Sequence, residues 1–377
     1  MIEAQRRGVS CVLMIDDLND WVDKSLRQEF IEAGGLFYSL NPVRKLWNLI
    51  TKEFFRRHHE KITVIDDTSI IGSSNIADEY GSIKYGTFDF YDLNMFTTNL
   101  GLEQSRNFFS QIADFYDIRL HQTLTNSQIL QKYNEKYKDS DFTNLNKEMK
   151  IIRTHPTLTE DEIQNYILNM INKAKKEVVI IQPYYYPIKK IEKSIADALD
   201  RGVHVELITS AKRDQPAYAP LKNFRLTKNL INKGLQVYEM HDKYLHMKAY
   251  FADDEVFTLG SFNNDRWSWK INNEANIYVE NAMEAYKFKK LIIEDVKSKC
   301  KLLNLNEQIG WIRTFRIHFW EFFLSVSEWT MNQKKYDKLR RRFEDIKEEK
   351  KRRALGDIFV NPSMNSYFDF DFNFSYE

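Results

Sequence analysis

The alternation of apolar and polar residues along the chain predicts strands interspersed with helices. Short runs of branched or aromatic residues at 62–65, 178–182 and 249–252 are typical of buried strands. Apolar residues at helical spacing predict two amphipathic helices, one with Ile163, Ile167, Met170 and Ile171 and the other with Ile188, Ile191, Ile195 and Leu199. Strands that alternate with helices in this way are typical of α/β folds.

Two stretches of the chain resemble each other over more than single residues. Segment 7–15 parallels 201–208, each a helix end followed by a strand. Segment 30–38 parallels 230–238, each a helix closed by Gly and then a strand. The second stretch also has an opening strand, 178–182, for which the first has no counterpart. We therefore expect the sequence to begin inside the first repeat, so that upstream sequence is missing or this copy is trimmed.

These patterns divide the chain into four parts. Residues 1–120 are the first half without its opening strand, 121–150 a polar connector, 151–282 the second half, and 283–377 a C-terminal helical extension with a tail. We expect an α/β fold in which two similar α/β sandwich halves of the chain pack around one cleft, followed by that helical extension.

A short polar motif, H-x-K-x4-D followed by G-S-x-N, occurs once in each half. The first copy comprises His59, Lys61, Asp66, Gly72, Ser73 and Asn75, and the second comprises His246, Lys248, Asp253, Gly260, Ser261 and Asn263. With eight His in the chain, about 0.06 chance matches to H-x-K-x4-D are expected at ordinary residue usage. His58 and His241 do not fit the pattern, and we interpret His58 as an ordinary surface or supporting residue.

Strand geometry explains the spacing of the motif. Side chains two positions apart on a strand point to the same face, so His59 and Lys61 project together, as do His246 and Lys248. The small Gly and Ser residues that follow allow close approach of the backbone to a phosphate. We interpret four other motif residues as structural, the aspartates because they close the turn after each strand: Asp66, Asp253, Ser73 and Ser261.

Composition limits the classes of function. The formal net charge is +1 and neither motif lies in a strongly basic stripe, so a nucleic-acid partner is not expected and a nuclease is disfavoured. Cys11 and Cys300 lack the spacing of a metal site or a disulfide, which suits a reducing compartment. The sequence has no apolar stretch of about 18 residues and no secretory signal at its start, so we expect no membrane span.

The region after residue 282 has a different character. Segment 311–329 is rich in Trp and Phe with interspersed Arg and His. This composition predicts either a helix packed on the domain or an interfacial helix with its aromatic rings at the lipid headgroups. Segment 334–353 mixes both charges and predicts a solvated helix whose cations could contact anionic lipid. The interfacial alternative makes a membrane surface a peripheral partner.

At its motifs the chain resembles the phospholipase D superfamily and, within it, the cardiolipin synthases. The resemblance covers about residues 3–282. Segment 75–80 reads N-I-A-D-E-Y, similar to the N-I-G-D-E-Y of cardiolipin synthases, and segment 263–274 is similar to their N-L-D-x-R-S-F-x-L-N-x-E. Asp92 resembles the aspartate of a later W-x-D segment, although no Trp is nearby.

This resemblance implies a two-step displacement through a phosphohistidine, with no metal ion or other cofactor. His59 is the expected nucleophile and His246 the expected general acid and base. An unperturbed imidazole titrates at about 6.5, so both protonation states exist near neutrality. Four residues are expected around the phosphoryl oxygens, where they stabilise developing charge: Lys61, Lys248, Asn75 and Asn263. Asp92 and Glu274 are expected to hold the far nitrogen of each imidazole.

The implied activity is that of a phosphatidyltransferase, which forms cardiolipin from phosphatidylglycerol-type glycerophospholipids. Hydrolytic phospholipase D and phosphatidylglycerophosphate synthase use the same residues and stay open as alternatives. A lipid-binding protein without activity is disfavoured because both motifs are complete. We expect an intracellular, membrane-associated location, at the mitochondrial or another internal membrane in a eukaryote and at the plasma membrane in a bacterium.

Overall fold

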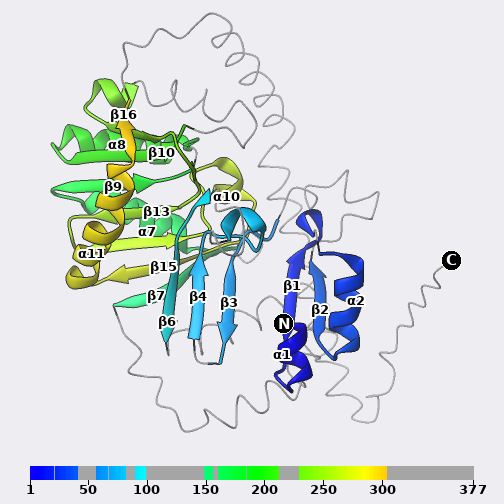
Figure 1. Ribbon diagram of the computed structural model, residues 1–377. Helices are drawn as coiled ribbons and strands as arrows, with labels where there is room; N and C mark the ends of the chain where they lie inside the picture. Colours follow the sequence, from blue (N-terminus) through cyan, green and yellow to red (C-terminus); the bar gives the residue numbers. More distant parts are fainter. Residues whose placement is uncertain are drawn as a thin grey trace, which may run out of the picture. The chain divides into compact units, whose positions relative to one another are not determined.

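The described part of the chain has a mixed α/β fold around a large sheet (Figure 1). The structure is a computed structural model, and it describes residues 1–20, 22–40, 57–66, 68–81, 90–98, 148–155, 160–183, 185–211 and 229–303. The aromatic segment 311–329, the charged segment 334–353, the C-terminal tail and nearly all of the predicted connector lie outside the described residues.

The large sheet contains nine strands, all from the second half and the residues that follow it. They are β7 (Met149–His155), β8 (Glu160–Asp161), β9 (Glu177–Ile181), β10 (His204–Ser210), β11 (Gln236–Met240), β13 (Ala249–Ala252), β14 (Val256–Gly260), β15 (Glu274–Glu280) and β16 (Cys300–Leu302). Their order is β16-β11-β10-β9-β13-β14-β15-β7-β8. β10 is parallel to β9 and β11, and the other pairings are antiparallel.

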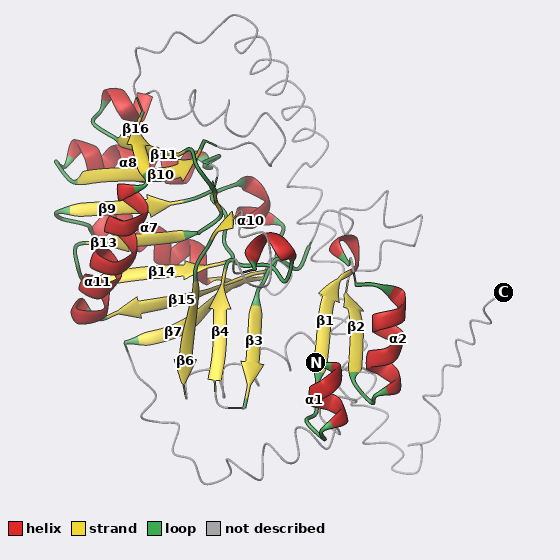
Figure 2. Cartoon of the chain, in the orientation of Figure 1, coloured by secondary structure: helices red, strands yellow, loops and turns green. Residues whose placement is uncertain are grey.

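Helices cover both faces of this sheet (Figures 1 and 2). They are α7 (Glu162–Lys173) and α8 (Lys189–Asp200) on one face, and α11 (Ala282–Phe288), the π-helical turn η5 (Lys289–Ile293) and α12 (Glu294–Ser298) on the other. Alternate residues of β9 enter the two cores, Val178 and Ile180 beneath α7 and α8, and Val179 and Ile181 beneath α11 and α12. Each such burial stabilises the fold by about 1.5–3 kcal/mol. Within the described ranges, no helix combines the length and the apolarity needed to cross a membrane.

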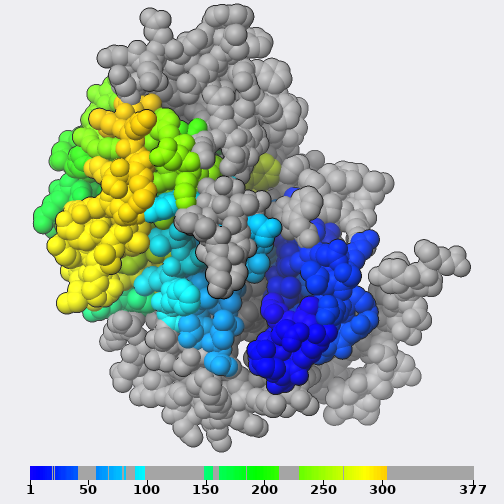
Figure 3. Space-filling model, in the orientation of Figure 1, coloured from blue at the N-terminus to red at the C-terminus, as the bar shows by residue number. Residues whose placement is uncertain are grey.

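Segment 282–303 packs on the second half, although the sequence analysis assigned residues from 283 onward to a C-terminal extension. Four of its apolar side chains are buried against the sheet: Ala285, Phe288, Ile293 and Val296. The rings of Phe257 and Phe288 stack with their centroids 4.4 Å apart. β16 then adds an edge strand beside β11. In the space-filling view this segment, yellow to orange, lies against the green residues of the second half (Figure 3). These helices therefore bury one face of the sheet of the second half.

The described residues of the first half contain two smaller sheets. Their strands are β1 (Val12–Asp16), β2 (Leu36–Leu40), β3 (Ile62–Ile65), β4 (Thr68–Gly72) and β6 (Asn94–Thr98), and α2 (Lys24–Glu32) connects β1 to β2. β1 and β2 are parallel, as β10 and β11 are, whereas β3, β4 and β6 are antiparallel, as β13, β14 and β15 are. In the second half β9 joins β10 to β13, but no strand of the described first half joins β1 to β3.

Candidate active site

The two motif segments lie at reciprocal contacts between the halves. The amide of His59 donates to the carbonyl of Asn273 over 3.0 Å, and the amide of Asn273 donates to the carbonyl of Arg57 over 3.0 Å. The amide of His246 donates likewise to the carbonyl of Tyr91 over 2.9 Å. This second contact extends the parallel pairing of two short strands, β5 (Phe90–Tyr91) and β12 (Tyr244–Leu245). Each histidine is thus fixed by backbone from the opposite half.

Each imidazole is bound through Nδ1 by a carboxylate from the other half. Nδ1 of His59 lies 2.9 Å from Oε2 of Glu274, and Nδ1 of His246 lies 2.8 Å from Oδ2 of Asp92. Both carboxylates are buried, with side-chain exposures of 0% for Glu274 and 6% for Asp92. An ionised carboxylate only accepts hydrogen bonds, so these contacts place a proton on Nδ1 of each ring. Nε2 of the neutral ring is then the nitrogen that can accept a proton or form a bond.

The motif serines hold these carboxylates in place. Oγ of Ser261 donates to Glu274 over 2.6 Å, and Oγ of Ser73 donates to Asp92. Ser268, which lies in the short helix α10 (Arg266–Lys270), donates to the second oxygen of Glu274 over 2.6 Å. Burial alone would raise the pKa of Asp92, but its hydrogen bond with His246 and the nearby charges lower that pKa below its ordinary value. Each carboxylate is therefore oriented by the motif serine of its own half.

The motif glycines are required by the neighbouring strand. A Cβ at Gly72 would lie 2.4 Å from the carbonyl oxygen of Leu93, and one at Gly260 would lie 2.3 Å from that of Ala275. Any larger residue would push apart the strands that carry the carboxylates. The sequence analysis attributed these glycines to close approach of a phosphate, whereas the structure shows close approach of β6 and β15.

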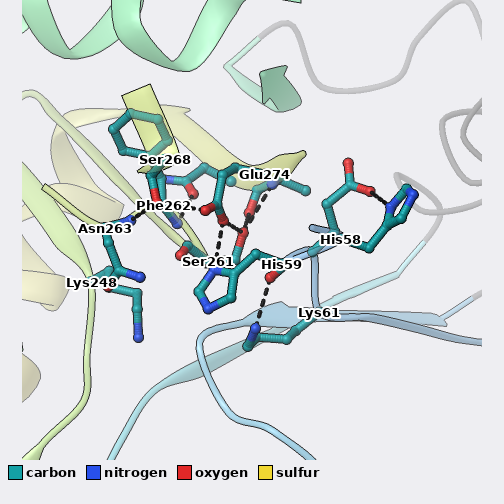
Figure 4. A network of polar contacts seen from close by, with 12 residues as sticks. His58, His59, Lys61, Lys248, Ser261, Phe262, Asn263, Ser268 and Glu274 are labelled. Atoms are coloured by element: carbon teal, nitrogen blue, oxygen red, sulfur yellow. Dashed lines mark hydrogen bonds and ion pairs between the residues drawn. The ribbon is translucent and has the colours of Figure 1, made fainter. Parts of the chain in front are cut away.

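Each motif lysine contacts the histidine of its own motif. Lys61 donates to the carbonyl of His59 over 2.7 Å, and Lys248 donates to that of His246 over 2.8 Å. Nζ of Lys248 is also 3.1 and 3.0 Å from the two ring nitrogens of His246. In Figure 4, His59, Lys61, Lys248 and Asn263 lie near one another, whereas His58 points away. Loss of solvation lowers the pKa of Lys61 to about 8 and that of Lys248 to about 7.

The two motif asparagines differ in their surroundings. Asn263 is buried, and its Oδ1 has no hydrogen-bond partner within the described part of the chain. Asn75 is exposed and donates over 2.9 Å to the hydroxyl of Tyr80, the last residue of the short 3-10 helix η3 (Asp78–Tyr80). That hydroxyl lies 3.4 Å from Nε2 of His246. The second asparagine is thus buried, whereas the first is exposed and is connected to His246 through a tyrosine.

The motif aspartates lie in the turns behind the strands. Asp66 and Asp253 both adopt left-handed backbone conformations, with φ of 52° and 59°. The carboxylate of Asp253 accepts from the amides of Lys175, Lys176 and Glu177 over 2.7, 2.8 and 2.9 Å. These contacts anchor the start of β9, away from the imidazoles.

Comparison with known proteins identifies the family. Residues 167–296 match a family model described as "Cardiolipin synthase, PLD-like domain". Cardiolipin synthase 2 of Staphylococcus epidermidis is 30% identical over 302 residues, which cover 78% of this chain and 58% of that protein. Cardiolipin synthase B of Salmonella typhi is 28% identical over 288 residues, covering 74% and 65%. The chain therefore contains a phospholipase D-like domain of the cardiolipin synthase type. It spans about three-fifths of the length of these curated relatives.

A solved structure shares the fold. The crystal structure of phosphatidylserine synthase from Haemophilus influenzae Rd KW20 superposes with a TM-score of 0.59 and 16% identity, covering 85% of this chain and 83% of that one. The likeness shows that the two proteins share the mixed α/β fold with its large sheet.

The sequence analysis of this phospholipase D-like chain missed a buried ion pair beside the first motif. Nε and Nη2 of Arg153 donate to Oε1 of Glu60 over 3.1 and 2.9 Å, and their side chains are only 8% and 4% exposed. His58 lies 3.4 Å from the other oxygen of Glu60, and its amide donates to Asp16 over 2.9 Å. His58 therefore supports the motif from a buried position. A glutamate between two motif residues was the only sequence signal, and it does not identify its arginine.

Proposed function

We propose that the protein is a phosphatidyltransferase that forms cardiolipin from phosphatidylglycerol-type phospholipids through a phosphohistidine. The observation that carries the proposal is the pair of imidazoles, each with Nδ1 on a buried carboxylate and each with a lysine of its own motif on the histidine carbonyl. A phosphodiester has two ester oxygens and one negative charge. It therefore matches a site with one nucleophile, one proton donor and two cations.

In the first step, Nε2 of His59 attacks the lipid phosphorus. The bond from phosphorus to the leaving alcohol breaks, and that oxygen takes a proton from Nε2 of His246. In the second step, neutral His246 takes the proton of an incoming hydroxyl, whose oxygen attacks phosphorus and releases His59. One phosphorus–nitrogen bond forms and breaks, so the enzyme returns to its starting state.

The different surroundings of the rings support this division of roles. The side chain of His59 is 25% exposed and that of His246 8%, so His59 is more open to a bulky phosphodiester. Burial and the charge of Lys248 lower the pKa of His246 to about 3, which favours a neutral imidazole. A phosphodiester anion beside it favours the imidazolium that the first step needs. Binding of the substrate and protonation of His246 are thereby linked.

Four side chains are proposed to surround the phosphoryl oxygens: Lys61, Lys248, Asn75 and Asn263. Lys61 and Lys248 supply positive charge in a site of reduced solvation, where charge stabilisation is strong. Asn263 offers an amide whose orientation is fixed by burial. Ser73, Ser261, Asp66 and Asp253 are assigned supporting roles, because their contacts are with the carboxylates or within the turns.

We propose in addition that the two halves, 1–120 and 151–282, are similar α/β units around one cleft, with a connector at 121–150 and a helical extension toward the C-terminus. The matching strand pairings support the repeat. A glycerophospholipid substrate requires contact with a bilayer, so the protein is proposed to act peripherally at a membrane surface inside the cell. The aromatic segment 311–329 is a candidate for that contact.

The test is a product assay on liposomes that contain labelled phosphatidylglycerol. Cardiolipin and glycerol should appear in equal amounts, and His59→Ala should abolish both. Excess glycerol should drive cardiolipin back to phosphatidylglycerol. Phosphatidic acid as the main product would instead identify a hydrolytic phospholipase D, and normal turnover by His59→Ala would overturn the mechanism.

A further inference from the structure

The residue that follows the motif asparagine by five positions differs between the halves. In the second half it is Ser268, whose hydroxyl donates to Glu274 behind His59. In the first half it is Tyr80, whose hydroxyl lies 3.4 Å from Nε2 of His246. The same sequence position therefore supports one imidazole from behind and covers the other from the reacting side.

Within the described part of the chain, Tyr80 is one of three aromatic residues around His246. Its ring meets the imidazole edge to face, with centroids 5.2 Å apart, and Phe90 stacks on the imidazole at 5.7 Å. Tyr244 lies at 6.0 Å, and Phe90 contacts both tyrosine rings, at 4.7 and 4.9 Å. These rings come from both halves, since Tyr80 and Phe90 precede Asp92 whereas Tyr244 precedes the second motif. We call Tyr80, Phe90 and Tyr244 the aromatic wall.

The reacting nitrogen of His246 is where water and alcohol compete. In a phosphohistidine mechanism, the acceptor that reaches Nε2 gives up its proton there and attacks phosphorus. The same intermediate yields a transferred lipid if that acceptor is an alcohol and phosphatidic acid if it is water. Rings packed around the base leave few positions for water at Nε2, whereas a headgroup alcohol is delivered to that nitrogen by the binding of its lipid.

We infer that Tyr80 is a specificity-determining residue that favours an alcohol acceptor over water. This inference rests on the proposed phosphatidyl transfer and deepens it, because it names the residue that selects the acceptor. The hydroxyl of Tyr80, held by Asn75, marks the position of the acceptor oxygen on Nε2. The ring of Tyr80 completes the aromatic wall that keeps bulk water from the same nitrogen.

The experiment measures the ratio of cardiolipin to phosphatidic acid at fixed concentrations of labelled phosphatidylglycerol in liposomes. Tyr80→Ser introduces the residue type found at the matching position of the second half and removes the ring. It should lower the product ratio by at least about fivefold, because water gains access to His246. Tyr80→Phe retains the ring and should keep the ratio within about twofold of the unaltered protein.

The product ratio separates selection from folding. Both products arise from one intermediate, so the ratio does not depend on how much of a variant is folded. Tyr286→Phe, on the exposed surface of α11, is the matched control and should leave the ratio unchanged. An unchanged ratio in Tyr80→Ser overturns this inference but leaves the transferase proposal intact. Absence of both products from the unaltered protein would overturn the transferase proposal itself.

Discussion

The surroundings of His59 and His246 are alike on the Nδ1 side, behind each ring, and different on the Nε2 side, in front of it. Behind each ring, a buried carboxylate from the opposite half binds Nδ1, and a motif serine binds the carboxylate. In front, His246 faces three aromatic rings and is 8% exposed, whereas His59 is 25% exposed. The carboxylates and the motif serines that hold them therefore fix the same imidazole tautomer, with the proton on Nδ1, in both halves. Residues outside the motif give the two imidazoles different access to solvent, and this difference supports the different roles proposed for them.

The most severe test of the likeness is to neutralise each carboxylate without changing its shape. Glu274→Gln and Asp92→Asn should each lower the rate of phosphatidyl transfer by about 10⁴-fold, because an amide does not stabilise the correct imidazole tautomer or the imidazolium. Initial rates of cardiolipin formation measure the effect. Glu284→Gln, at an exposed position of α11, should keep the normal rate. A large loss of rate in only one of the two carboxylate variants would contradict the equivalence of the carboxylates that bind Nδ1 of the two imidazoles.

Removing the second imidazole should expose the difference in roles. His246→Ala should slow transfer from phosphatidylglycerol by about 10²- to 10⁴-fold, since the leaving alcohol then lacks its proton donor. A phosphodiester with p-nitrophenol as leaving group needs no such donor. It should still release one burst of p-nitrophenol from His246→Ala but none from His59→Ala. The opposite pattern would exchange the two assignments.

The ion pair between Glu60 and Arg153 distinguishes the halves structurally, because the matching position of the second motif is the apolar Met247. Arg153→Met should cost about 3–5 kcal/mol in the free energy of unfolding, since it leaves a buried carboxylate without its partner. Chemical denaturation measures the loss. The double variant Glu60→Met, Arg153→Met should recover most of it, and a double variant as unstable as the single one would refute the account.

The same pair predicts an acid dependence of stability. Burial alone would raise the pKa of Glu60, but Arg153 and His58 outweigh it and lower the pKa to about 2. A carboxylate whose pKa is lower in the folded state contributes stability above its ordinary pKa of about 4.5 and loses that contribution as the pH falls toward 2. The free energy of unfolding should therefore fall less steeply between pH 5 and 3 for Glu60→Gln than for the unaltered protein. Identical slopes would contradict this.

The smallest predicted effect is the change of anion affinity with pH, and both motif lysines, Lys61 and Lys248, should contribute to it. Their lowered pKa values, about 8 for Lys61 and about 7 for Lys248, leave them partly neutral at pH 8, and a bound phosphate favours their protonation. The affinity for inorganic phosphate should thus fall by at least about tenfold between pH 8 and 9, with proton uptake on binding. Calorimetry in buffers of different ionisation enthalpy measures that uptake. Binding that is independent of pH over this range would count against a shared anion site.

Much of this arrangement could be predicted from local sequence. The strands within the two motifs, at 62–65 and 249–252, were predicted from composition, and the structure contains them as β3 and β13. Each passes through a left-handed turn, at Asp66 or Asp253, into its antiparallel partner. The matching segments around α2 and β11 likewise predicted helix-then-strand units that the structure contains. The type and order of these elements are set by interactions between near neighbours in sequence.

Contacts between the halves could not be predicted in the same way. Arg153 and Glu60 are 93 positions apart, and nothing in either segment specifies the other. The exchange of carboxylates between the halves, and the distance of Tyr80 from His246, depend equally on how two sheets meet. The burial of segment 282–303 was missed for a related reason, because its apolar face is evident but the sheet that it covers is distant in sequence.

The most direct test of the central claim is to trap the covalent intermediate and locate it. Without its general base, the His246→Ala variant should accumulate phosphohistidine after one burst with the p-nitrophenyl phosphodiester. Rapid quench at alkaline pH followed by peptide mass spectrometry should find the phosphatidyl group on His59 alone. The modification on another residue, or continued turnover of the unaltered enzyme with no trapped species at any time, would contradict the account.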